Sequence, residues 1–173
     1  MPIRLTVPIV LLIGLLIARI WAGETPSSGS RFQANFKAPL KENSFRCLFD
    51  NKFLEVDSIT AELIRYNQRT TLILRNATQT HKLYFQITGR LSKGSFVLDN
   101  PSEAYASMVS SNEPCLFTTD EYYQGMLMID FIDTTTGMLS GSFELLAYSD
   151  ECRKVIRVQN GRFLVKYQER DIM

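Results

Sequence analysis

The chain has few of the residues on which most metal and nucleophilic sites depend. Its 173 residues include one histidine, one tryptophan and three cysteines. No CxxC or His-x-His spacing is present, which excludes the common zinc-site patterns. No serine lies in a GxSxG elbow, and Ser142, which follows Gly141, stands inside an alternating strand pattern. The usual hydrolase nucleophile is therefore missing too. We therefore expect no cofactor, no metal site and no enzymatic activity.

The chain also lacks an excess of either charge. Its 19 basic and 18 acidic residues give a formal charge of +1 at pH 7. Arg4 and Arg19 lie in an N-terminal targeting segment, so the rest of the chain carries 17 basic residues against 18 acidic ones. A nucleic-acid-binding module needs a basic surface that releases counterions from phosphates. The composition therefore predicts no nucleic-acid partner.

One apolar run, at residues 5–18, follows Arg4 and has the form of the hydrophobic region of a secretory signal peptide. The run is shorter than the roughly 20 residues that span a bilayer. Small Ala22 provides a cleavage position, so residues 1–22 are interpreted as a signal peptide and residues 23–31 as a flexible polar linker. The sequence thus predicts export to the periplasm, the cell envelope or the exterior.

Arg19 leaves a second interpretation of this segment open. A charge between the apolar run and the cleavage position can slow processing. Residues 1–22 would then remain as a signal anchor and tether the protein to the membrane, with Arg19 reaching the interface. A buried core helix is disfavoured, because Pro8 and Gly14 interrupt the run and no polar face would meet water.

Residues 32–169 are predicted to form one β-rich domain. Short runs rich in β-branched and aromatic residues alternate with turn-forming clusters at the spacing of an all-β protein. We expect a single antiparallel β-sandwich, with a β-barrel as the alternative, since both give the same period-two pattern. The runs comprise residues 59–66, 71–75, 82–88, 95–98, 127–132 and 139–147, with 104–109 assigned as strand rather than as a helical turn.

Two hairpins are predicted near the C-terminus. Residues 127–132 should pair with 139–147 around the loop Asp133 to Gly137, with Leu127, Ile129 and Phe131 on one face. Residues 155–158 should meet 162–167 across Asn160-Gly161, a dipeptide that favours a type I′ turn. Phe163, Val165 and Tyr167 should then share one face, opposite Arg162 and Lys166.

Glycines are given structural roles. Gly141 interrupts a strand pattern, which is typical of a bulge or of close approach by another backbone. Gly125 and Gly161 are predicted to mark chain reversals.

The three cysteines of an exported chain allow one disulfide and leave one thiol over. The predicted hairpin brings the loop of Cys152 to the same end as Cys115, so Cys115–Cys152 is the preferred bridge. Pairing through Cys47 and a set of buried free thiols are the alternatives.

Candidate functional residues are few. Tyr122 and Tyr123 are the predicted surface-binding residues, because adjacent residues on a strand face opposite ways and one of the two should be exposed. Asp130, Asp133 and Glu144 near one hairpin could form the carboxylate pair of a glycoside hydrolase. Charges in turns and at alternating strand positions are normally solvated, which weakens the case for a carboxylate pair. The single histidine, His81, is predicted to lie in a turn as a solvated residue.

The C-terminal half resembles a family of small exported proteins of Bacteroidota, mostly lipoproteins, grouped as a domain of unknown function. The resemblance spans residues 94–167 and depends most on Leu139-Ser140-Gly141-Ser142-Phe143 and on Gly161-Arg162-Phe163, followed by Tyr167. It departs at Leu164, where the family often has Asp, and at Gly23, where the lipidated Cys would stand. The resemblance implies an exported β domain with no established activity and carries over no catalytic residue.

Three functional hypotheses follow. The first is a non-catalytic, envelope-associated domain that acts through its surface on an unknown envelope protein. The second is a sandwich or barrel that holds a small apolar or sugar ligand, suggested by its many aromatic residues. The third, the carboxylate-dependent glycoside hydrolase, is the least supported.

Overall fold

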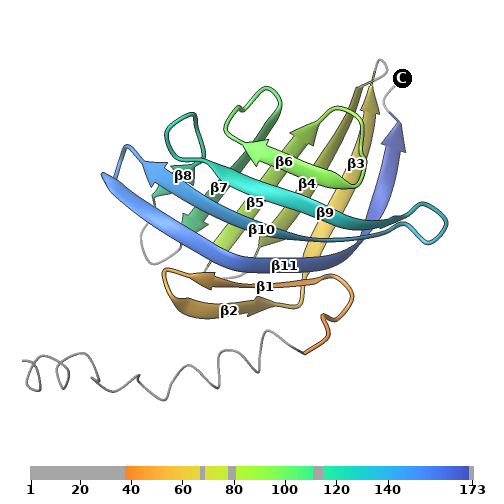
Figure 1. Cartoon of the computed structure of the whole chain (residues 1–173), viewed down its shortest axis with the longest axis horizontal. Helices are drawn as coiled ribbons and strands as arrows, with labels where there is room; N and C mark the ends of the chain where they lie inside the picture. The colour runs from red at the N-terminus through yellow and green to blue at the C-terminus, as the bar shows by residue number, and fades with distance from the viewer. Residues whose placement is uncertain (1–37, 67–68, 78–80, 111–114, 172–173) are drawn as a thin grey trace, which may run out of the picture. The chain divides into compact units, whose positions relative to one another are not determined.

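The computed structural model describes residues 38–66, 69–77, 81–110 and 115–171. Their regular structure consists of eleven β-strands, which confirms the all-β prediction (Figure 1). The strands are β1 Ser44–Phe49, β2 Lys52–Val56, β3 Ile59–Tyr66, β4 Arg69–Ala77, β5 His81–Thr88, β6 Gly94–Leu98, β7 Ala104–Ser110, β8 Leu116–Thr118, β9 Gly125–Asp133, β10 Met138–Ser149 and β11 Lys154–Asp171.

All eleven strands belong to one sheet, in the order β2-β1-β11-β3-β4-β5-β7-β8-β10-β9-β6. An additional pairing of β10 with β11 makes part of this sheet ring-like, while β1–β2 and β9–β6 extend from it (Figure 1). The prediction of an antiparallel sandwich is wrong in two respects. There is one sheet rather than two, and β11 runs parallel to β3 along residues 167–171. The C-terminal part of β11 lies beyond the residues that pair with β1. It runs beside β3 in the same direction.

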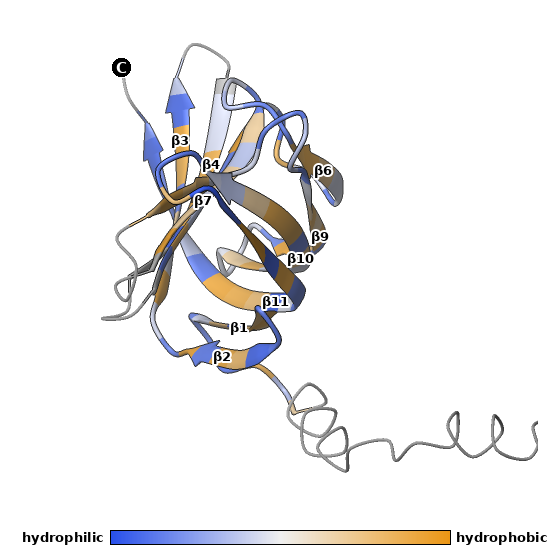
Figure 2. Ribbon diagram, turned by 90° about the vertical axis from the view of Figure 1, so that its left-hand side faces the viewer, coloured by the Kyte–Doolittle hydropathy of each residue, from blue (hydrophilic) through white to orange (hydrophobic). Residues whose placement is uncertain are grey.

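The core is built by period-two alternation along the long strands. In β10, Leu139, Phe143, Leu145 and Ala147 are buried, while Glu144 between them is exposed. In β11, Phe163, Val165 and Tyr167 are buried, and Arg162 and Lys166 are exposed, as the sequence predicted. Figure 2 shows the resulting alternation of apolar and polar segments along β11. Removing each large apolar side chain from water contributes roughly 1.5–3 kcal/mol.

Phe143 and three other phenylalanines, each from a different strand, form an aromatic cluster. The ring centroid of Phe143 lies 4.9 Å from that of Phe85, 6.0 Å from Phe45 and 6.5 Å from Phe163. The first two pairs are edge-to-face, the arrangement that aromatic quadrupoles favour. The cluster therefore joins β1, β5, β10 and β11 at one point of the core.

Glycines make room for this cluster. A Cβ on Gly161 would lie 2.5 Å from the Phe143 ring. A Cβ on Gly141 would overlap the carbonyl oxygen of Met128 and lie 2.8 Å from the Phe163 ring. The predicted close approach at Gly141 is therefore confirmed. Gly161 stands in mid-strand and not at the predicted chain reversal.

The predicted hairpin at Asn160-Gly161 is wrong, because β11 runs unbroken through this dipeptide. Its pairing with β10 shifts between Phe143↔Gly161 and Leu145↔Val158, so β11 carries one extra residue there. A type I′ turn needs positive φ at both central residues. Only Asn160, with φ of 54°, has it. The dipeptide forms a β-bulge instead, and hydrogen bonding to β10 and β1 on the two sides keeps the chain extended.

A second bulge changes the face of Phe131. The β9–β10 register passes from Ser140↔Phe131 to Gly141↔Ile129, which leaves Asp130 as the extra residue. Phe131 is consequently 45% exposed, and Ile132 packs against the core in its place. The hairpin itself is confirmed, but the predicted sharing of one face by Leu127, Ile129 and Phe131 fails at its last member.

The β1–β2 hairpin was not among the predicted elements. Its two-residue loop is Asp50-Asn51, between the paired Phe49 and Lys52, with φ of 44° and 64°. Asp50 also binds β11 in two ways: its amide donates to the carbonyl of Arg157 at 2.9 Å, and its carboxylate accepts the Arg157 amide at 2.9 Å. The hairpin is thereby attached to the ring-like part of the sheet.

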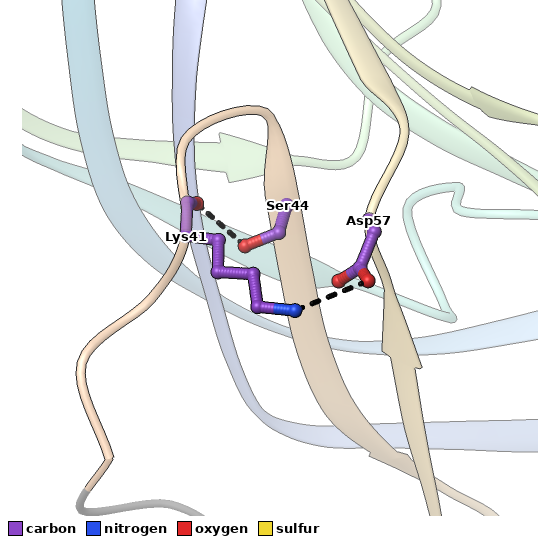
Figure 3. Close-up of polar contacts among 3 residues, drawn as sticks. All are labelled: Lys41, Ser44 and Asp57. Atoms are coloured by element: carbon purple, nitrogen blue, oxygen red, sulfur yellow. Dashed lines mark hydrogen bonds and ion pairs between the residues drawn. The ribbon is translucent and has the colours of Figure 1, made fainter.

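Polar contacts fix the entry of the chain into β1 (Figure 3). The Ser44 hydroxyl donates to the Lys41 carbonyl at 2.6 Å, and Lys41 Nζ lies 3.5 Å from an Asp57 carboxylate oxygen. The ion pair spans the start of β1 and the β2–β3 connection. It is solvent-exposed and so contributes little to stability.

The remaining predictions concern the N-terminal segments and His81. Residues 1–22, the linker 23–31 and the first part of the 32–169 domain lie outside the described residues. His81 begins β5 and does not lie in the predicted turn, because its backbone already pairs with Ser110. In the part of the chain that the structure describes, no helix has the length and apolar character of a membrane span.

Candidate functional site

The loop between β8 and β9, residues 119–124, carries the predicted tyrosines and is held at both ends. Thr119 is buried, and its hydroxyl oxygen accepts the Ala106 amide at 2.9 Å, which ties the loop to β7. At the other end the Gln124 carbonyl accepts the Leu146 amide at 3.0 Å. The loop is therefore attached to two different strands.

Asp120 organises the turn between these two attachments. One carboxylate oxygen accepts the amides of Tyr122 at 2.8 Å and Tyr123 at 2.7 Å. The Asp120 amide donates in turn to the Tyr123 carbonyl at 2.9 Å. These bonds form an Asx turn, in which a side chain takes the place of a backbone acceptor.

The two tyrosines differ in environment. The ring of Tyr123 stacks on that of Tyr148 of β10, with centroids 4.9 Å apart and planes 15° apart. Tyr122 is 80% exposed. One of the pair is thus exposed, as predicted, but for another reason, since the segment is a turn and not an extended strand. Tyr123 supports the loop, and Tyr122 is left available at its surface.

The disulfide Cys115–Cys152 lies at the same end of the sheet. It connects the residue before β8 to the β10–β11 turn, with Cα atoms 6.0 Å apart. β8 and β10 pair at Thr118↔Tyr148. The disulfide therefore lies beside the two strands of which β10 carries Tyr148, the residue on which Tyr123 stacks. The loop end of the sheet is therefore held by a covalent bond as well as by hydrogen bonds.

Cys47 is the remaining thiol and lies buried in β1. Desolvation by burial raises its pKa to about 12. A thiol with that pKa is not a nucleophile at neutral pH, because the thiolate is the reactive form. Cys47 fills core space.

The aromatic residues that suggested an internal ligand site divide by environment. Five of them are buried, namely Phe85, Phe117, Phe143, Phe163 and Tyr167. Next to the phenylalanine cluster is an apolar cavity lined by side chains that include Ile59, Leu74 and Leu83. The cavity has a volume of about 20 Å³. That is room for about one water molecule and not for a sugar.

None of the three candidate carboxylates is buried. Asp130 and Glu144 are exposed. Asp133 accepts the Thr136 hydroxyl at 2.7 Å and the Thr135 amide at 2.9 Å within the β9–β10 turn. The hydrogen bond from Thr136, followed by that from Thr135, lowers the pKa of Asp133. Its carboxylate is thus engaged in turn formation, as that of Asp120 is.

A further group of polar aromatic residues lies on β5 and β7, on the face opposite the core. Tyr84 and Tyr105 have ring centroids 5.7 Å apart, and the Arg75 guanidinium lies 5.8 Å from the Tyr84 ring centroid. Burial, reinforced by Tyr105, raises the pKa of Tyr84 to about 12. Tyr84 therefore remains a neutral hydrogen-bond donor, and its hydroxyl donates to Gln86 at 2.8 Å.

Sequence reasoning did not identify Asp120, Thr119 or Tyr148 as parts of the site. A local signal exists for Asp120, since an aspartate two residues before the amide it binds is typical of an Asx turn. The stacking of Tyr123 on Tyr148 has no local signal, because it depends on the pairing of β8 with β10.

The comparisons with known proteins identify a family. Residues 41–165 match the model of a domain of unknown function, DUF6252. No curated protein and no solved structure matches the chain. The match covers nearly the whole of the sheet just described.

Proposed function

The chain belongs to the DUF6252 family, and from this premise we propose that it is a non-catalytic, exported module of the bacterial envelope that binds a partner protein through Tyr122. The observation that carries the proposal is the 80% exposure of an aromatic side chain on a loop with fixed ends. Envelope association follows the family resemblance of the sequence.

A fixed, exposed aromatic residue favours binding energetically. Tyrosine offers a large contact area with few rotatable bonds, so little side-chain entropy is lost when a partner covers it. The bonds of Asp120 and the stacking of Tyr123 order the loop before any partner arrives. Pre-organisation of this kind lowers the cost of association.

The disulfide supports an exported location. Cys115–Cys152 is compatible with an oxidising compartment, where such bonds persist. Together with the apolar segment at residues 5–18 it favours the periplasm or the cell surface over the cytoplasm.

A surface role accounts for the structure better than the alternative of an internal ligand. The apolar cavity beside the phenylalanine cluster, about 20 Å³, is far below the roughly 300–1,000 Å³ of ordinary ligand pockets. Among the described residues, the large hydrophobic side chain with the greatest exposed fraction is Tyr122, on the β8–β9 loop.

The proposal is tested by expressing the full chain with its own N-terminal segment and purifying it from host envelopes in mild detergent. A photo-crosslinking amino acid is placed at position 122 and, as the matched control, at Tyr66, which is 53% exposed on β3. We expect a discrete adduct of one protein mass at position 122 and none at position 66. Native mass spectrometry should show the same added mass on the unmodified chain, reduced about tenfold in abundance by Tyr122→Ser.

Two outcomes would overturn the proposal. One is an identical adduct pattern at both positions, which indicates random collision. The other is retention of the partner mass by Tyr122→Ser. Catalytic turnover that disappears on substitution of one carboxylate would defeat the non-catalytic part.

A further inference from the structure

The two outermost strands of the sheet, β2 and β6, differ in their chemistry. Each is five residues long and stands at one end of the strand order. Such an edge strand presents unpaired amide and carbonyl groups that can pair with another chain. Charged side chains on the edge are the usual protection against this.

Edge strand β2 has that protection and β6 does not. The sequence of β2, KFLEV, places exposed Lys52 and Glu55 along its edge. The sequence of β6, GSFVL, contains no charge and no proline. Gly94 and Ser95 are exposed, and Val97 is 47% exposed. Around Gly94 there is open space, because a Cβ built there would meet nothing within 4 Å.

We propose that β6 pairs in antiparallel fashion with β6 of a second copy of this chain, related by a two-fold axis at Phe96. This register is the one in which all five residues of both strands overlap. It places Ser95 opposite Val97 of the second copy, and Gly94 opposite Leu98. Every contact of such a symmetric interface occurs twice, except that between the two copies of Phe96 on the axis.

The charges that flank β6 are complementary in this register. Lys93 directly precedes the strand, and Asp99 directly follows it. Pairing about Phe96 sets Lys93 of each copy beside Asp99 of the other. Among the residues that the structure describes, neither side chain forms an ion pair. The register that strand length dictates therefore also forms two opposite-charge contacts, which is the argument for a second copy over an unrelated strand.

The apolar surroundings of β6 favour the same occupant. Val97 pairs with Met126 of β9, and Met126 and Met128 are 47% and 39% exposed. Figure 2 shows mainly apolar residues along β6 and its neighbour β9. A second copy would bring an equally apolar surface to this margin. The interface is small, so we expect a weak dimer that forms at the higher protein concentrations.

Charge exchange provides the test. The full chain, Lys93→Glu, Asp99→Lys and the double variant are compared by native mass spectrometry in mild detergent over about a hundredfold range of concentration. The unmodified chain should form a dimer. Each single variant creates two like-charge contacts and should raise the dissociation constant about tenfold or more. The double variant should dimerise again, and an equimolar mixture of the single variants should form the heterodimer.

The other edge supplies the matched control. Lys52→Glu makes the same charge change on β2 and should leave the dimer unaffected. Circular dichroism of each variant checks that the substitutions, at exposed Lys52 and Lys93 and at partly buried Asp99, leave the fold intact. Tyr122→Ser should also leave the dimer intact, so this inference can fail or succeed separately from the proposed function.

Cysteine cross-linking tests the register. A Ser95→Cys chain mixed with a Val97→Cys chain should form an intermolecular disulfide, because facing residues of paired strands have Cβ atoms about 4.5–5.5 Å apart. Ser95→Cys alone should not, since the two copies of residue 95 are diagonal, at about 7–8 Å. A chain that is monomeric throughout, a dimer indifferent to both single charge variants, or single variants that the double exchange does not rescue would each overturn the proposal.

Discussion

The interior around Phe143 and the loop around Tyr122 are held by different forces. At Phe143 four aromatic rings from four strands meet, and the nearby glycines have no space for a single added carbon. At Tyr122 the ring is 80% exposed, and the chain beneath it is fixed by the Asp120 carboxylate and stacking of Tyr123.

This difference indicates where the sequence is constrained by folding and where it is available for function. In the interior, close packing determines each residue, because density there is that of a crystal. At the loop, the backbone is held in place by Asp120, Thr119 and the disulfide. The exposed Tyr122 side chain is not one of these stabilising contacts, which is why its exposure is informative.

The largest effect is expected from Gly141→Val. The added side chain meets a backbone carbonyl, that of Met128, and the Phe163 ring, and the carbonyl cannot rotate away without loss of the β9–β10 pairing. We expect a loss of roughly 4–5 kcal/mol, at the upper end for single substitutions. Chemical denaturation measures it. The control is Ser142→Val, one residue along the same strand on the opposite face, which should change stability by less than about 1 kcal/mol. Equal effects of the two would show that the interior is less constrained than its geometry implies.

Removal of the disulfide should have the next largest effect. The bridge spans 37 residues of sequence, and chain-entropy reasoning gives a loss of roughly 4 kcal/mol on its removal. Cys152→Ala measures the cross-link, because Cys152 is exposed. Cys115→Ala should cost more, because the buried Cys115 side chain is also lost from the core. Thermal midpoints with and without a reductant check this, and a midpoint unchanged by reduction would contradict it.

Several of these features could be predicted from sequence, and the exceptions have physical causes. Alternation over residues 139–147 predicted the buried face of β10, and the hairpin it implied brought Cys115 and Cys152 together. Asn160-Gly161 misled because a local turn preference competes with strand pairing on both sides of β11, and pairing prevails. Phe131 misled because a one-residue bulge reverses the faces of a strand.

The candidate site was predictable only in part. The tyrosine pair could be singled out, and one member is exposed, but the argument from strand alternation was wrong because the segment is a turn. What fixes the pair could not be predicted, since Tyr148 reaches Tyr123 through strand pairing between residues distant in sequence. The parallel β3–β11 pairing and the ring-like closure were missed for the same reason, as period-two patterns do not specify strand order.

The smallest effect concerns the turn at the opposite end of β9, where Asp133 uses the same kind of Asx turn as Asp120 without a disulfide beside it. The Thr136 hydroxyl and the Thr135 amide hold the pKa of Asp133 below its usual value. A carboxyl whose pKa is lower in the folded state stabilises the fold above its unfolded pKa, near 4, and this contribution is lost as pH falls through the folded pKa. Asp133→Ala should therefore lower the thermal midpoint slightly at pH 7, and the difference from the unmodified chain should shrink in acid. Asp133→Asn keeps an acceptor oxygen but no charge, so its small deficit should also shrink in acid. A deficit in Asp133→Ala that is constant from neutral to acid pH would show that the carboxylate charge does not hold this turn, and that the exposed turns depend on backbone geometry alone.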